Sequence, residues 1–293
     1  MSKRIIEISN PAYLHIDHRQ LVIEKDKQRI ASIPVEDMAA LVLATPQVVM
    51  THAAIGFLLS QNVAVVSCDG KHQPVGLFMH LQGNVLRGER LSLQSEMKYP
   101  LKKSLWKDIV KAKIRLQAKV ASDVCGSENI SPLIRKVRSG DPDNIEAQAA
   151  RRYWPRLFPD QFRRDRDADD QNRLLNYGYA IVRALVARSL CAAGLHPGLG
   201  LHHRNRYNDF PLADDVMEPY RPFVDLTVWQ LVEDGLGQAE MDTDIRKRLI
   251  EVVKHPVKIG GDQAPLQNAI QKTAQSLAAC ISEKGKPLLL PDG

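Results

Sequence analysis

The spacing of apolar residues changes once along this chain, near residue 92. Before that point the apolar stretches are short and are separated by turn-forming pairs such as Asn10-Pro11 and Asp69-Gly70, which is typical of strands. Beyond it, apolar residues such as Leu105 and Ile109 recur at helical spacing. We therefore predict a β-rich unit followed by a helical unit.

The chain of 293 residues is long enough to form both units around real hydrophobic cores. The predicted fold class is α+β, with a small β-sandwich-like domain followed by a larger all-α domain. Polar residues and two glycines predict a linker, and the end of the chain is expected to fray. The predicted parts are a β-rich domain over 1–82, a linker over 83–93, a helical domain over 94–283 and a flexible tail over 284–293.

Capping residues predict several helix ends in the second unit. Asp141 followed by Pro142 is typical of an N-cap with proline at the first helical position. Asp170 predicts the start of the next helix and Gly194 its end. Further helices are expected over 212–232, 244–253 and 262–281, one helix within the β-rich unit over 52–61, and strands over 5–6, 13–16, 21–23, 30–35, 40–44, 63–67 and 75–79.

The composition is that of an ordinary globular protein, with 44% apolar and 25% charged residues. The net charge of +6 is unevenly distributed, because residues 91–190 hold 20 Lys and Arg against 12 Asp and Glu. This basic excess favours a polyanionic partner such as DNA, and a solvated helical surface is the alternative explanation.

Targeting and redox signals are lacking in the sequence. Residues 1–20 contain no secretory signal, and apolar runs such as 39–44 are far too short to span a membrane. Cys68, Cys125, Cys191 and Cys280 form no Cys-x-x-Cys pair, so neither a zinc site nor a redox pair is indicated. We expect a cytoplasmic protein with reduced thiols and no membrane contact.

Carboxylates and histidines in the second unit are candidate metal ligands. Asp215 and Glu218 share one face of a helical turn, and the pair His202-His203, of which one imidazole could bind a metal, ends a glycine-rich loop. Together with Glu146 they form an oxygen and nitrogen donor set that suits Mg²⁺ or Mn²⁺. Each residue also has an ordinary explanation, such as a solvated glutamate or a carboxylate at a helix N-terminus, and the spacing does not prove that they meet.

Several runs of residues resemble the CRISPR spacer-acquisition integrase, the first of the two universal adaptation proteins of CRISPR systems. The loop between His203 and Glu218 most resembles the type II branch of that family. The runs that carry the resemblance are 146–154, 175–179, 194–203 and 215–222 in the helical unit, and 13–15, 21–23 and 63–69 in the β-rich unit.

The resemblance implies a catalytic metal site. Glu146, His203 and Glu218 match the family's ligands to Mg²⁺ or Mn²⁺, and Asp215 matches an additional acid that binds the metal or supports a ligand. His202 is the alternative ligand if the register is shifted by one residue. Glu218 stands where many relatives have aspartate.

The resemblance also implies the reaction and the partners. A 3′-hydroxyl of short foreign DNA attacks a phosphodiester in a CRISPR repeat, and the β-rich domain forms a homodimer. The small second adaptation protein is an expected partner, and in the type II-like branch so is the RNA-guided effector nuclease. The residues expected to contact DNA phosphates are Arg135, Lys136, Arg138, Arg151, Arg152, Arg163, Arg164, Arg204 and Arg206.

Two other functions remain open from the residues. A general metal-dependent nuclease for branched or single-stranded DNA would use the same ligands. A DNA-binding scaffold would bind without turnover, although every expected type of ligand is present in this chain.

Overall fold

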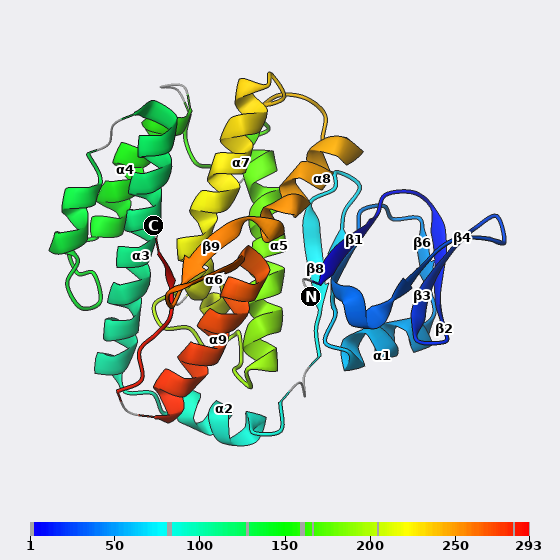
Figure 1. Cartoon of the computed structure of the whole chain (residues 1–293), viewed down its shortest axis with the longest axis horizontal. Helices are drawn as coiled ribbons and strands as arrows, with labels where there is room; N and C mark the ends of the chain where they lie inside the picture. Colours follow the sequence, from blue (N-terminus) through cyan, green and yellow to red (C-terminus); the bar gives the residue numbers. More distant parts are fainter. Residues whose placement is uncertain are drawn as a thin grey trace.

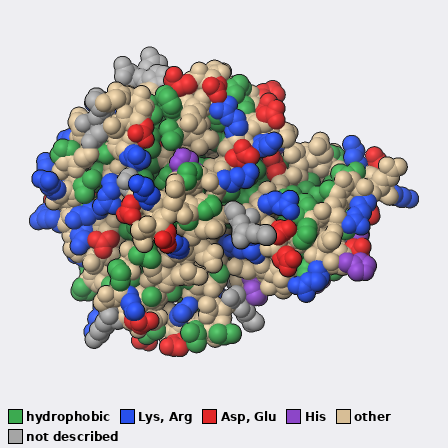
Figure 2. All heavy atoms as spheres, in the orientation of Figure 1, with side chains coloured by type: hydrophobic (Ala, Val, Ile, Leu, Met, Phe, Trp, Pro, Cys, Tyr) green, Lys and Arg blue, Asp and Glu red, His purple; other side chains and the backbone are tan. Residues whose placement is uncertain are grey.

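The computed structural model describes residues 3–80, 84–126, 129–158, 162–165, 167–203, 205–283 and 285–292. The predicted fold class is confirmed: strands dominate before residue 80 and helices after residue 87. The strand-rich N-terminal unit projects from one side of the larger helical unit (Figure 1), and the space-filling view shows the same outline (Figure 2). No helix among the described residues is long and apolar enough to cross a membrane.

The first sheet separates two hydrophobic cores. Its strands β1, β5 and β7 are parallel, and β8 pairs antiparallel to β7. Val65 packs into the core of the N-terminal unit, whereas Val66, the next residue, joins the core of the helical unit. Because one core packs on each face of this sheet, every position of β5 is apolar. In sheet order the strands are β1 (Arg4–Ile8), β5 (Met38–Leu43), β7 (Ala64–Cys68) and β8 (Pro74–Phe78).

The second sheet closes the N-terminal core. Two tight hairpins join its first three strands, with left-handed residues at both turn centres, His18-Arg19 and Asp26-Lys27. Helix α1 (His52–Ser60) lies within the helix predicted over 52–61, and it follows Thr51, whose hydroxyl accepts a hydrogen bond from the Ala54 amide. The sheet order is β4 (Gln28–Pro34), β3 (Gln20–Lys25), β2 (Ala12–Asp17) and β6 (Val48–Met50).

Residues 87–93 of the predicted linker are helical, so that part of the linker prediction is wrong. They belong to α2 (Arg87–Ser95), which the buried Gln94 attaches to the helical unit. The Gln94 amide donates to the carbonyls of His196 and Leu199 and accepts from the His196 amide. These bonds join positions about one hundred residues apart, so the polar local sequence could not reveal them.

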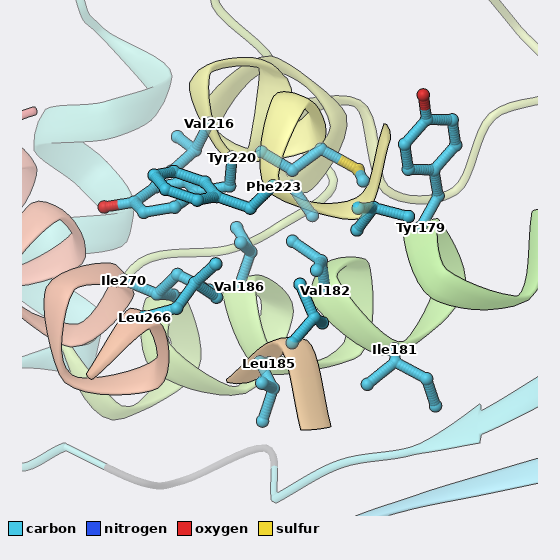
Figure 3. Close-up of a cluster of buried hydrophobic side chains, with 14 of the residues drawn as sticks. Tyr179, Ile181, Val182, Leu185, Val186, Val216, Tyr220, Phe223, Leu266 and Ile270 are labelled. Atoms are coloured by element: carbon cyan, nitrogen blue, oxygen red, sulfur yellow. The ribbon is translucent and has the colours of Figure 1, made fainter. Parts of the chain in front are cut away.

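Helix α5 forms the centre of the helical unit (Figure 1). It packs so closely on α7 that a Cβ on Gly178 would lie 2.5 Å from a methyl group of Val224. Figure 3 shows Val182 and Val186 of α5 facing Tyr220 and Phe223 across this core. The helices are α3 (Tyr99–Cys125), α4 (Ile145–Leu157), α5 (Gln171–Ala192), α6 (Pro211–Met217), α7 (Arg221–Glu233), α8 (Thr243–Glu251) and α9 (Leu266–Ser282), with 3-10 turns η1 (Val35–Asp37), η2 (Ser131–Lys136), η3 (Glu218–Tyr220) and η4 (Val252–Lys254).

Two predicted helix starts are wrong. Helix α4 begins after Asn144 rather than after Asp141, because the Asn144 side chain caps it and the Asp141 carboxylate accepts from the amides of Ile145 and Glu146. The helix predicted over 262–281 begins at Leu266, because residues 262–265 pair as a strand. Helix 212–232 is interrupted at Pro219, which has no amide hydrogen to donate.

A small sheet at the C-terminus corrects the predictions of an all-α second domain and a flexible tail. Strand β9 (Pro256–Ile259) lies between β10 (Asp262–Pro265) and β11 (Pro291–Asp292). Just before β11 the tail is hydrogen-bonded to α9, because the Leu289 carbonyl accepts from the Thr273 hydroxyl and the Leu289 amide donates to the Ser276 hydroxyl. The tail prediction is therefore wrong for residues 289–292, because tertiary hydrogen bonds replace the missing local ones.

Candidate active site

The start of α4 positions Glu146. The Asp141 carboxylate accepts hydrogen bonds from the Ile145 amide at 2.9 Å and the Glu146 amide at 3.0 Å. These bonds satisfy amides that have no partner inside the helix. The Glu146 side chain is 24% exposed and reaches back toward α3.

Glu218 lies deeper, at the turn between α6 and α7. Its side chain is 5% exposed, and both carboxylate oxygens are bonded. Oε1 accepts from the Arg221 guanidinium at 2.8 Å, and Oε2 accepts from the Lys113 ammonium at 2.5 Å. Lys113 donates at the same time to Glu146 at 2.5 Å, so one lysine joins two of the predicted ligands.

The charges of this cluster fix its protonation states. Burial alone would raise the pKa of Glu218, but Arg221 and Lys113 outweigh it and lower the pKa to about 2. Burial alone would lower the pKa of Lys113, but Glu218 and Glu146 raise it to about 12. The buried Glu218 is therefore ionised and Lys113 is charged at neutral pH.

Asp215 organises the histidine loop. It is buried, and its carboxylate accepts from the amides of Leu201, His202 and His203. Its Oδ1 atom also lies 2.6 Å from Nδ1 of His203, and this hydrogen bond raises the pKa of the His203 imidazole. Gly200 makes the turn possible, since a Cβ there would lie 2.9 Å from the His203 carbonyl oxygen.

The two adjacent histidines differ in their surroundings. The charges of Glu218 and Glu146 contribute to raising the pKa of the His203 imidazole, and this ring meets Trp106 edge-on, with ring centroids 5.6 Å apart. The His202 ring instead stacks on Trp106, with ring centroids 4.3 Å apart and planes within 2°. The structure thus brings Glu146 and Glu218 together at Lys113, and it is His203 whose ring is bonded to Asp215, whereas His202 stacks on Trp106.

The donor set fits a divalent cation. Two carboxylates already converge on one positive charge, and carboxylate oxygens are the ligands that Mg²⁺ and Mn²⁺ prefer. A hydrogen bond from Nδ1 of His203 to Asp215 leaves Nε2 as the nitrogen able to bind a metal. Within the described part of the chain, no three His, Cys, Asp or Glu side chains are grouped closely enough to hold a metal ion. Lys113 bonds to both Glu146 and Glu218.

A second buried network lies behind Arg221. Asp225 accepts from the hydroxyls of Tyr153 and Tyr179, and the Arg221 guanidinium lies 4.5 Å from the Tyr179 ring centre. Burial raises the pKa of Asp225 to about 7, although both tyrosine hydrogen bonds oppose the shift. Sequence reasoning missed Lys113, Arg221, Tyr179 and Asp225. The available signal was polar residues at buried helix positions, such as Lys113 one turn after Val110.

The predicted DNA contacts occupy different environments. Arg164 is half-buried: its guanidinium donates to Asn172 and Asn176 and lies over the Tyr179 ring. Arg138 is exposed but paired in two hydrogen bonds with Asp143. Figure 2 shows Lys and Arg side chains gathered on the side of the molecule where α3 and α4 lie. Arg135, Lys136, Arg151, Arg152, Arg163 and Arg206 are also exposed, and Arg204 lies outside the described residues.

Comparison with known proteins identifies the family. The family model described as CRISPR associated protein Cas1 matches residues 6–251. A CRISPR-associated endonuclease Cas1 from Neisseria meningitidis serogroup C (strain 8013) is 36% identical over 296 residues, which cover 100% of this chain and 97% of that protein.

Solved structures share the fold at lower identity. A casposase bound to its integration product has a TM-score of 0.81 and 18% identity, and the match covers 98% of this chain and 92% of that one. A Cas6-RT-Cas1–Cas2 complex has a TM-score of 0.77 and 21% identity, covering 98% and 36% respectively. The resemblance read from the sequence is confirmed, and the chain belongs to the CRISPR associated protein Cas1 family.

Proposed function

We propose that this protein is a metal-dependent DNA integrase that inserts short foreign DNA into a CRISPR repeat array. The observation that carries the proposal is that Glu146 and Glu218, from separate parts of the chain, meet at one ammonium group, and that the charges of both contribute to raising the pKa of His203. The names of the similar proteins support the same class, since one is a CRISPR-associated endonuclease and one is a casposase bound to an integration product.

Three residues would hold the cofactor. Glu146, His203 and Glu218 are the proposed ligands to Mg²⁺ or Mn²⁺, which when bound neutralises charge on the phosphate and lowers the pKa of the attacking hydroxyl. Asp215 holds the His203 ring in position, because its carboxylate is already saturated with donors. Arg221 keeps Glu218 ionised and oriented.

The proposed reaction is a direct exchange of phosphodiester bonds. The 3′-oxygen of the incoming DNA forms a bond to a phosphorus atom of the repeat, and the bond from that phosphorus to the repeat's own 3′-oxygen breaks. The attacking hydroxyl loses one proton and the departing oxygen gains one, so the exchange as a whole neither consumes nor releases a proton. Positioning and charge stabilisation dominate such transfers, so no covalent protein intermediate is needed.

The same proposal covers the partners. Exposed arginines on η2 and α4 would bind DNA phosphates. The N-terminal unit would form the homodimer, supported by the exposed apolar residues Val75 and Phe78 on the edge strand β8. The small second adaptation protein is a proposed partner, and the solved complex of a similar chain, named Cas6-RT-Cas1–Cas2, supports a second Cas protein in that role. The RNA-guided effector nuclease is proposed from the sequence resemblance alone.

Strand transfer tests the proposal. Purified protein, the small partner, a short DNA duplex and a supercoiled plasmid with a repeat are mixed with Mn²⁺ or Mg²⁺. Glu146→Gln is expected to lower joining by about a hundredfold or more while DNA binding is retained, because a ligand charge is lost. The matched control is Glu251→Gln, since Glu251 is exposed and pairs with Lys254.

The outcomes separate the candidate functions. Joining by the wild type and the control, but not by Glu146→Gln, supports the integrase. Equal joining by all three proteins contradicts the role of Glu146. Degradation without joining favours a general nuclease, and binding without any reaction favours a DNA-binding scaffold.

A further inference from the structure

A lysine ammonium holds the two glutamates at the centre of the proposed metal site. Lys113 comes from α3, and its side chain is 11% exposed. Lys119, two turns further along the same helix, is 55% exposed and forms an ordinary surface pair with Asp123. Burying a lysine is costly unless it is paired, so the two glutamates account for its position.

The bonds of Glu218 leave no oxygen without a donor. Lys113 takes Oε2 and Arg221 takes Oε1. A metal shared by Glu146 and Glu218 would need the place that the Lys113 ammonium occupies, 2.5 Å from one oxygen of each glutamate. The competition between a protein cation and a metal cation is therefore built into this carboxylate.

Lys113 is the donor that can leave. Arg221 is fixed a second time, because its guanidinium stacks over the ring of Tyr179. The Lys113 ammonium, among the described residues, is bonded to the two glutamates alone. Its flexible four-carbon chain can withdraw without moving the helix, whereas the planar guanidinium is constrained by its stacking.

The charges of the site favour the same exchange. The site holds three carboxylates, Glu146, Glu218 and the buried Asp215, against the two cations Lys113 and Arg221. Adding a divalent cation while Lys113 stayed in place would leave an excess of positive charge in a mostly buried site. Withdrawal of Lys113 reduces that excess and frees one oxygen on each glutamate.

We propose that Lys113 is a positioning residue that holds Glu146 and Glu218 together in the metal-free protein and that a divalent metal must displace. This inference rests on the proposed metal-dependent function. It predicts that the lysine lowers the apparent metal affinity while it stabilises the protein without metal.

Mn²⁺ binding to the isolated protein, measured by calorimetry without DNA, tests the inference. Lys113→Met keeps the chain length but removes the competing charge, and it is expected to bind Mn²⁺ on the order of tenfold more tightly than the wild type. In EDTA the same variant is expected to melt at a lower temperature, and Mn²⁺ should raise its melting temperature more than that of the wild type. Lys119→Met is the matched control and should behave as the wild type.

A second variant has the opposite expected sign. Lys113→Arg places a planar fork against both carboxylates and should bind Mn²⁺ on the order of tenfold more weakly. If Lys113→Met folds and binds Mn²⁺ no more tightly than the wild type, or if Lys113→Arg binds it equally well, the inference is overturned. Mn²⁺ binding by none of the four proteins would overturn the metal site itself, whereas failed strand transfer with the expected binding would overturn only the proposed function.

Discussion

Asp225 is the buried carboxyl group whose surroundings most alter its acidity. It accepts hydrogen bonds from Tyr153 and Tyr179, and Tyr179 in turn lies beneath the Arg221 guanidinium that holds Glu218. Because burial raises its pKa to about 7, Asp225 holds a proton in the folded protein at pH values where the unfolded chain has lost it.

This shift makes stability depend on pH in a known direction. The contribution of Asp225 is fully present below the unfolded pKa near 4 and is lost as pH rises toward 7. Asp225→Asn removes the titrating group, so its stability relative to the wild type should improve by about 2 kcal/mol between pH 5 and pH 8. Urea unfolding at both pH values measures the difference, and a constant difference would contradict the assignment.

At the scale of elements, the contact between α5 and α7 positions Arg221, the first residue of α7, which bonds to Glu218. Gly178 lets the two helices approach, and α7 begins at Arg221, directly after the turn that carries Glu218. A wider separation of these helices would move Arg221 away from the centre of the site. The close approach is therefore a structural requirement of the site as well as of the core.

Gly178→Ala tests this packing. The new methyl group would lie 2.5 Å from Val224, so the variant should lose about 1–3 kcal/mol of unfolding free energy. Gly56→Ala in α1 is the control, because a Cβ there meets nothing within 4 Å and alanine favours a helix. Adding Val224→Ala to Gly178→Ala should recover part of the loss in thermal unfolding, and no recovery would show that the contact is not the cause.

At the scale of the whole molecule, the first sheet and one ion pair join the two units. Strand residues such as Val66 enter the helical core, and Glu7 of β1 pairs with the buried Arg246 of α8. The two units therefore pack as one body, with the proposed metal ligands in the helical unit and exposed basic residues on η2 and on α4, the helix that also carries Glu146. This arrangement predicts that DNA binding depends on that surface rather than on the total charge.

Charge-matched triple variants test that prediction. Replacing Arg135, Lys136 and Arg151 by Gln should weaken DNA binding and lower the slope of log affinity against log salt by about 0.9 for each lost phosphate contact. The control replaces Lys25, Lys27 and Arg29, which are exposed on the hairpin of β3 and β4. Fluorescence anisotropy at several salt concentrations measures both sets, and equal losses would contradict a localised surface.

The sequence by itself determined the division into two units, most of the helices and strands, and the residue types of the site. These properties depend on local spacing, because helical hydrogen bonds span four residues and a strand alternates every two. The runs of residues that resemble the CRISPR spacer-acquisition integrase also indicated Glu146, His203, Asp215 and Glu218 as site residues.

Only the tertiary structure decided how those residues are connected. Lys113 and Glu218 are 105 residues apart, and Asp215 bonds the ring of His203 while the ring of His202 stacks on Trp106. Arg164 was expected at the DNA surface but is bonded to Asn172 and Asn176, and the expected loose tail forms a strand. Such contacts depend on which helix faces pack together, and that packing is set by burial over the whole chain rather than by spacing along it.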